Sequence, residues 1–223
     1  VTNDFAIGIG HTRWATHGVP SDVNAHPHYS QNKKLAIIHN GIIENHQALK
    51  TELQSTGAQF VSDTDSETIP WLWQRESSIE PNEEKAFLNT LNLLDGAFAI
   101  AGIQAKDAAK LWFARRGSPL LLSRGEAGFY VASDALAVAT VATHVIYLQE
   151  GQWGWSDNHG VHIFNPDGTS VEAVWEDMPP MASATEKGPY NHYMLKEIHE
   201  QPRVFLEIIN AYARQDGNIH FPQ

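Results

Sequence analysis

From residue 97 onward, the chain consists of short apolar segments that turn-forming residues separate closely. Short connections of this kind favour antiparallel pairing, because parallel strands need long crossovers. Many of the segments are apolar at successive positions, so both faces of each sheet have to be covered. The segments are Ala97–Ile103, Leu111–Arg115, Leu120–Ser123, Phe129–Ala132, Val145–Leu148 and Val161–Phe164.

Two sheets packed together, with helices outside them, satisfy this requirement. The sequence therefore predicts the α+β class, as a four-layer αββα sandwich of two mainly antiparallel sheets. Earlier in the chain, the apolar runs Ala6–Ile9 and Leu35–Ile38 predict two further buried strands.

Three segments in the first half of the chain predict helices. Asn45–Thr56 and Asn82–Asp95 repeat apolar residues at helical spacing, and a glycine follows each of them. Between them, Thr64 and Glu67 have the spacing of a capping box. This predicts a helix that runs from Ser66 to about Glu76.

The C-terminal part of the chain has a different pattern. Pro179–Pro189 is rich in helix breakers and small residues, which indicates a boundary loop. Tyr193–Arg214 follows with an apolar helical stripe that Pro202 interrupts. We therefore expect one domain over residues 1–185 and a connecting segment over residues 186–223.

Composition excludes several classes of partner. The formal net charge is −11 and no basic stripe is present, which argues against nucleic acid and anionic membranes as partners. No apolar run approaches the roughly 20 residues of a membrane-spanning helix. The chain has no cysteine, so no disulfide can form, and we expect a cytoplasmic protein. Because it starts at Val1, we expect it to be part of a longer protein.

Two polar blocks carry most of the chemistry, HTRWATHG at His11–Gly18 and HNGIIENH at His39–His46. In the first block, Arg13 offers a planar guanidinium that can bind a carboxylate through two parallel hydrogen bonds. A structural salt bridge is the alternative role for this arginine.

The second block places Asn40 directly before Gly41. An amide side chain and an unhindered backbone N–H can converge on one oxygen, which suits an oxyanion hole. A hairpin turn is the alternative, since Asn-Gly is a strong turn signal. For Asp65, the sequence by itself favours a helix cap.

Together with several other motifs in the same order, these two blocks resemble the class II, N-terminal-nucleophile, glutamine amidotransferases. Within that class, the chain is most similar to the branch that aminates fructose-6-phosphate. The phosphoribosyl-pyrophosphate branch is less similar at Trp14-Ala15. The resemblance rests on GIGHTRWATHG, VNAHPH, HNGIIENH, FVSDTDSE, LDGAFA, RRGSPLLL, FYVASDALA and HYMLKEIHEQP.

The resemblance implies the N-terminal-nucleophile hydrolase fold and a site for L-glutamine. By likeness, Arg13 would hold the α-carboxylate and Asp65 the α-ammonium group, and Asn40 and Gly41 would form the oxyanion hole. The remaining residues expected to line the site are Trp14, Thr16 and His17. His26 and His28 match neighbouring positions, without an assigned role.

Members of this class use an N-terminal cysteine as nucleophile, and this chain has none. We therefore expect the chain alone to be inactive, and the parent protein to hydrolyse glutamine to glutamate and ammonia. The resemblance implies that ammonia reaches fructose-6-phosphate on a separate isomerase domain, in a homodimer, without metal or organic cofactor.

Two further hypotheses stay open at this point. A degenerate domain that binds glutamine or a partner protein without catalysis would explain the missing cysteine. A metal-dependent hydrolase could draw ligands from the imidazoles and carboxylates of the polar blocks. Those side chains are His26, His28, His39, His46, Asp63 and Asp65.

Overall fold

The computed structural model describes residues 7–13, 17–178 and 187–212 of the chain. The chain divides into two compact units, residues 1–178 and residues 179–223. The expected boundary at residue 185 stays a prediction.

The first unit contains two sheets, and every strand pairing among its described residues is antiparallel. The seven-stranded sheet has the order β1 (His28–Tyr29), β2 (Leu35–Ile43), β3 (Gly96–Gln104), β4 (Asp107–Arg116), β8 (Trp153–Ser156), β9 (Val161–Phe164), β10 (Ser170–Val171). The four-stranded sheet has the order β11 (Glu176–Asp177), β7 (His144–Tyr147), β5 (Leu121–Gly125), β6 (Gly128–Ala132).

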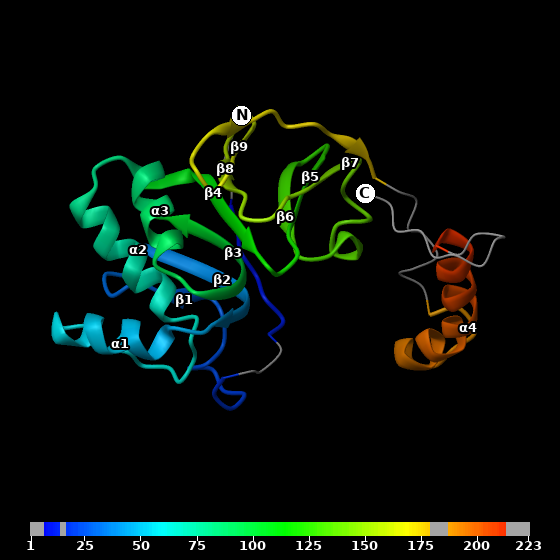
Figure 1. Ribbon diagram of the computed structural model, residues 1–223, viewed down its shortest axis with the longest axis horizontal. Helices are drawn as coiled ribbons and strands as arrows, with labels where there is room; N and C mark the ends of the chain where they lie inside the picture. The colour runs from blue at the N-terminus through cyan, green and yellow to red at the C-terminus, as the bar shows by residue number, and fades with distance from the viewer. Residues whose placement is uncertain (1–6, 14–16, 179–186, 213–223) are drawn as a thin grey trace. The chain divides into compact units, whose positions relative to one another are not determined.

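Alternation along β3 explains why the larger sheet is covered on both faces. Phe98 and Ile100 belong to the core under the helices, whereas Ala99 belongs to the core between the sheets. Successive side chains of a strand point to opposite faces, so an apolar strand has to be buried twice. Figure 1 shows the helices grouped beside β2 and β3, with β5, β6 and β7 elsewhere in the unit; these helices are α1 (His46–Ser55), α2 (Thr68–Ile79) and α3 (Glu83–Asn92).

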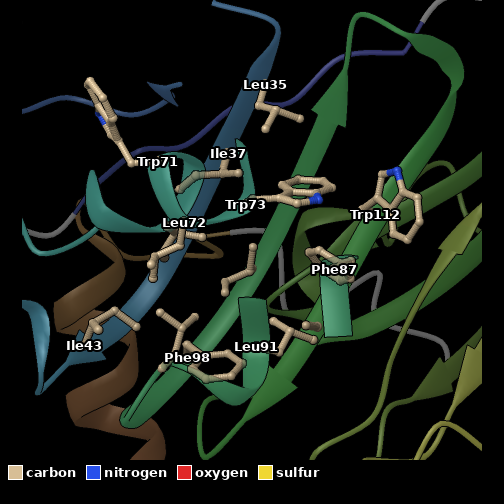
Figure 2. Packing of buried hydrophobic residues seen from close by; sticks show 14 of the residues in the cluster. Leu35, Ile37, Ile43, Trp71, Leu72, Trp73, Phe87, Leu91, Phe98 and Trp112 are labelled. Carbon is tan, nitrogen blue, oxygen red and sulfur yellow. The ribbon is translucent and has the colours of Figure 1, made fainter. Parts of the chain in front are cut away.

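The core between the helices and the larger sheet is rich in aromatic side chains. Trp73 of α2 lies 4.7 Å from Phe87 of α3 and 5.8 Å from Trp112 of β4, measured between ring centroids. All three are fully buried, and Figure 2 shows them gathered above the sheet with Ile37 and Leu35 nearby. Side chains of this size dominate core energetics, so this interface anchors the unit.

The two stacked antiparallel sheets and the α+β class confirm the predicted fold class. Helices α1, α2 and α3 form the outer layer on the larger sheet. Between the strands of the smaller sheet, the described chain forms one short 3₁₀ helix, η1 (Ala135–Ala137), which follows β6 and precedes β7.

Two strand predictions need correction. The run Ala6–Ile9 is not a strand over its described residues 7–9. An apolar run becomes a strand only where a neighbour completes its hydrogen bonds, and these residues belong to no ladder of the described chain. The opposite error concerns β8 (Trp153–Ser156), a buried strand that we did not predict.

The capping-box prediction at Thr64 and Glu67 is wrong. Helix α2 begins at Thr68, and no side-chain hydrogen bond caps it. The carboxylate of Glu67 instead accepts hydrogen bonds from the backbone N–H and the hydroxyl of Ser62, at 2.7 and 2.6 Å. The acidic side chain therefore organises the preceding loop.

The described part of the second unit contains α4 (Tyr193–Tyr212). Pro202 lies inside this helix and does not end it, in contrast to the predicted interruption. Among the described residues, no helix has the combination of length and apolar character that crossing a membrane requires.

Candidate functional site

The Asn40-Gly41 pair lies inside a strand. In β2, Asn40 pairs with Ala99 and Gly41 with Phe98 of β3, and the ladder continues to the strand end at Ile43. The alternative of a hairpin turn is therefore wrong. Both residues are held by hydrogen bonding along a strand, which is a more rigid support than a loop provides.

Gly41 has a backbone conformation that a residue with a side chain could not adopt at this position. Its φ is +131°, and an added Cβ would lie 2.0 Å from the carbonyl oxygen of Ala97. Both the steric space and the dihedral angle require glycine here. Asn40, by contrast, has an exposed side chain.

The carboxylate of Asp65 is buried, and few donors of the described residues contact it. Its side chain is on the first unit's loop before α2, and the residue is 2% exposed. Oδ2 accepts a hydrogen bond of 2.7 Å from the backbone N–H of Ile43, and Oδ1 has a 3.5 Å contact with the Ser66 hydroxyl. Its carboxylate does not cap α2, so the helix-cap alternative is wrong.

One cavity of about 260 Å³ brings together the two polar blocks and the loop before α2. It is lined by His11, Arg13, His17, His26, His39, Asn40, Gly41, Ile42, Thr64, Asp65 and Ser66. Pockets for drug-sized ligands span roughly 300 to 1,000 Å³, so this volume suits a smaller molecule. An acid, a guanidinium and an exposed amide thus face a space of amino-acid size.

Arg13 organises the loop that follows it. Its guanidinium donates to the carbonyl oxygens of His17, Gly18 and Val19, at 2.7, 3.1 and 3.3 Å. No ion pair found among the described residues includes Arg13, so the salt-bridge alternative has no support there. These contacts use three of its five N–H donors, which leaves two for a ligand.

His17 lies beside Asp65. Its Nδ1 is 3.9 Å from Oδ1 of Asp65, and its ring packs edge-on against His46 with 5.2 Å between centroids. The distance to the carboxylate exceeds a hydrogen bond. Trp14 and Thr16, which we expected at the site, lie outside the described residues.

Two neutral imidazoles, those of His26 and His39, line the cavity, and the ring of His28 packs against that of His26. Burial, together with the neighbouring His28 and His11, lowers the pKa of His26 to about 3. Burial lowers the pKa of His39 to about 4 and also lowers that of His28. These rings are therefore uncharged at neutral pH and do not oppose a cationic group near Asp65.

Sequence reasoning missed several residues of this cavity. His11 bridges Arg13 and Asn40, and its position two residues before Arg13 was the available signal. Ser66 hydrogen-bonds Nδ1 of His39 at 2.8 Å. His28, which had no assigned role and does not line the cavity, contacts the hydroxyl of the cavity residue Thr64 at 3.0 Å. Apart from the one to Arg13, these hydrogen bonds join residues that are far apart in the sequence, so no local sequence pattern indicates them.

The described residues do not provide the ligands that the hypothesis of a metal-dependent hydrolase requires. Within the described ranges, no group of three or more histidine, aspartate or glutamate side chains is arranged to hold a metal ion. The imidazoles instead pack against one another. The rings of His11 and His26 are tilted with 4.4 Å between their centroids, and those of His26 and His28 meet edge-on with 4.7 Å between theirs.

Comparison with known sequences gives one family. A sequence model described as a glutamine amidotransferase domain matches residues 11–140. The glutamine–fructose-6-phosphate aminotransferase (isomerizing) of Bacillus cereus is 43% identical over 98% of this chain and 36% of its own length. The protein of the same name from Staphylococcus aureus (strain Mu50) is 42% identical over 99% of this chain and 36% of its own length. The chain thus spans about a third of these curated relatives.

Solved structures give the same fold. A glutamine phosphoribosylpyrophosphate amidotransferase from B. subtilis, complexed with ADP and GMP, has a TM-score of 0.60 and 24% identity, covering 73% of this chain and 35% of that chain. An allosteric regulatory enzyme of purine biosynthesis has a TM-score of 0.57 and 26% identity, covering 65% and 31%.

Proposed function

This chain belongs to the glutamine amidotransferase domain family, and we propose that it binds L-glutamine in the cavity between Asp65 and Asn40. The full protein would release ammonia from the carboxamide and transfer it to fructose-6-phosphate, giving glucosamine-6-phosphate. Relatives of that name, 43% identical over almost the whole chain, support this acceptor over phosphoribosyl pyrophosphate. The homodimer and the cytoplasmic location remain part of this proposal.

The observation that carries the proposal is the buried carboxylate of Asp65. A buried charge is costly unless it is paired, and this one has one short hydrogen bond among the described residues. The α-ammonium group of an amino acid would supply the missing cation. Arg13, with two N–H donors to spare, would take the α-carboxylate at the opposite end.

The carboxamide of a glutamine held in this way would be the group exposed to attack. We propose that the Asn40 side chain and the Gly41 N–H stabilise the oxyanion that forms there. A thiol would attack the carbonyl carbon, and the C–N bond would break as ammonia leaves. Water would then cleave the thioester to glutamate. His17, Trp14 and Thr16 would line the pocket.

The chain contains no cysteine, so the thiol has to come from outside these 223 residues. The same observation favours a second candidate function, in which the domain binds glutamine without turning it over. The two candidates share the binding site and differ in turnover.

The binding site is tested by isothermal titration calorimetry of the chain with L-glutamine, with L-asparagine as a shorter competitor. We expect Asp65→Asn to weaken binding by about tenfold to a hundredfold, because a hydrogen bond to a charged group contributes roughly 1.5–3 kcal/mol. Asp63→Asn is the matched control, because Asp63 is exposed in the same loop and does not line the cavity. Equal weakening in both variants would contradict the assignment.

Turnover is tested with the complete protein that carries this chain. Release of glutamate from glutamine, coupled to glucosamine-6-phosphate formation from fructose-6-phosphate, supports the amidotransferase. Tight binding of glutamine without any glutamate release supports the binding module instead.

A further inference from the structure

His11 joins the two polar blocks through both of its ring nitrogens. Nδ1 is 2.9 Å from the backbone nitrogen of Arg13, and Nε2 is 2.6 Å from Oδ1 of Asn40. The two contacts link a loop to a strand that lies 29 residues further along the chain. Through these two contacts, His11 connects the backbone of the loop to the side-chain amide of Asn40.

These contacts determine which nitrogen of the His11 ring carries the proton. A backbone N–H can only donate, so Nδ1 accepts from Arg13 and has to be unprotonated. A neutral imidazole carries its single proton on the other nitrogen. Nε2 of His11 consequently donates to the amide oxygen of Asn40.

The tautomer in turn selects one orientation of the Asn40 amide. An asparagine amide can turn by half a rotation and exchange its oxygen for its nitrogen. In the turned orientation, the Nδ2 hydrogens of Asn40 would face the Nε2 hydrogen of His11, and two donors would meet without an acceptor. The contact therefore commits the oxygen to His11 and leaves the Nδ2 hydrogens for another partner.

An oxyanion hole needs that orientation, because a donor stabilises the developing negative charge and a carbonyl oxygen would oppose it. Asn40 is exposed, so packing alone does not fix its amide. The ring of His11 is itself steadied by His26, whose centroid is 4.4 Å away. His26 offers this contact as an uncharged ring, since burial keeps its pKa low.

We propose that His11 is a positioning residue for glutamine hydrolysis, which holds the Asn40 amide with its N–H donors toward the substrate oxygen. The inference rests on the proposed function of the cavity. Because His11 acts through Asn40, its removal has to lower kcat more than it raises the KM for glutamine. A residue that only stabilised the loop would change both, or would change KM through Arg13.

Two substitutions separate the two contacts of His11. His11→Asn places an acceptor near the position of Nδ1 and keeps the contact to Arg13, but it is too short to reach Asn40. His11→Gln extends an amide N–H to about the position of Nε2 and restores the donor to Asn40. In the complete protein, we expect His11→Asn to lower kcat by roughly tenfold to a hundredfold, short of the loss on removing an oxyanion donor outright. The KM should change by less than about threefold.

His11→Gln should recover most of the lost kcat, and this recovery is the outcome that a purely structural role would not produce. His159→Ala is the control, because His159 is an exposed histidine of a turn that lies outside the cavity. A double-mutant cycle adds a second criterion. In the Asn40→Ala background, His11→Asn should lower kcat by less than about twofold, since residues that act as a unit are not additive.

NMR spectroscopy of the chain tests the contact without any turnover. In ¹⁵N-labelled protein, the His11 ring should show the tautomer protonated at Nε2, and His11→Asn should shift the side-chain amide signals of Asn40. If the complete protein does not hydrolyse glutamine, the proposed function fails and these spectra alone decide the His11 contact. A ring protonated at Nδ1, additive losses in the cycle, or no recovery with His11→Gln would each overturn the proposal.

Discussion

The two halves of β2 share one hydrogen-bonded ladder and differ in what they present. Leu35 and Ile37 of the first half are 6% and 0% exposed and pack in the aromatic core under the helices. Asn40 and Gly41 of the second half pair with β3 in the same register but line a cavity. The difference teaches that the core half fixes the strand, so that the polar half holds the residues of the proposed site on a rigid support.

His39 marks the transition between the halves. It points to the same face as Ile37, since residues two apart share a face of a strand. It is 3% exposed, like its apolar neighbours, yet its Nδ1 is hydrogen-bonded to Ser66. At this position, a polar stretch of the strand begins, and it ends before Ile43, which is buried in the same core as Ile37.

The comparison predicts that the core half governs stability. Ile37→Ala should lower the free energy of unfolding by about 4 kcal/mol, because replacing a buried isoleucine by alanine typically costs about 2–5 kcal/mol. Urea denaturation followed by tryptophan fluorescence measures the loss. Val61→Ala, at an exposed position, should change stability by less than about 0.5 kcal/mol. A loss below 1 kcal/mol for Ile37→Ala would break the distinction between the halves.

The polar half should govern turnover and not stability. In the complete protein, Asn40→Ala should lower kcat at saturating glutamine by about a hundredfold or more, because an oxyanion donor contributes roughly 3 kcal/mol to the transition state. The Tm should stay within about 2 °C of the parent, since an exposed side chain contributes little to folding. A fall in Tm comparable to that of Ile37→Ala would show that this half is structural too.

Arg13 sharpens the comparison, because it faces the same cavity from a loop. Arg13→Ala should raise the KM for glutamine by about tenfold to a hundredfold through loss of charged hydrogen bonds to the α-carboxylate. It should lower kcat far less than Asn40→Ala does. Steady-state kinetics of glutamate release separate the two effects. Equal changes of kcat and KM in both variants would contradict the assigned roles.

The smallest expected effect is the contribution of His39 to the pH dependence of the free energy of unfolding. Burial lowers the pKa of His39 to about 4, whereas an unfolded histidine titrates near 6.5. Unfolding therefore takes up a proton between these two values, so this contribution is complete above pH 6.5 and is lost as the pH falls toward 4. His39→Gln should flatten the pH dependence by about 1–2 kcal/mol relative to the parent.

Denaturation with urea at pH 7 and pH 4.5 measures this difference for the parent and the variant. His159→Gln is the matched control for removing one imidazole, because His159 is exposed and does not line the cavity. Identical slopes for the parent and His39→Gln would contradict a buried neutral imidazole at the site.

The sequence by itself determined the periodic elements. Apolar runs separated by turns predicted β3, β5, β6, β7 and β9 within two residues, and they predicted β4 without its first four residues. Helical spacing predicted α1 and α3 within a few residues. These patterns are local, because each strand or helix face has to be buried somewhere. The sequence also supplied, through resemblance, the site residues that the structure brings to one cavity: Arg13, His17, Asn40, Gly41 and Asp65.

Only the tertiary structure decided what those residues contact. Asn-Gly in isolation predicts a turn, and its pairing with β3 made it part of a strand. Asp65 in isolation predicts a helix cap, and the approach of Ile43 gave its carboxylate another donor. The contact between His11 and Asn40, at 2.6 Å, joins residues that are 29 positions apart. Hydrogen bonds between distant segments follow from the packing of the whole unit, and no local pattern encodes them.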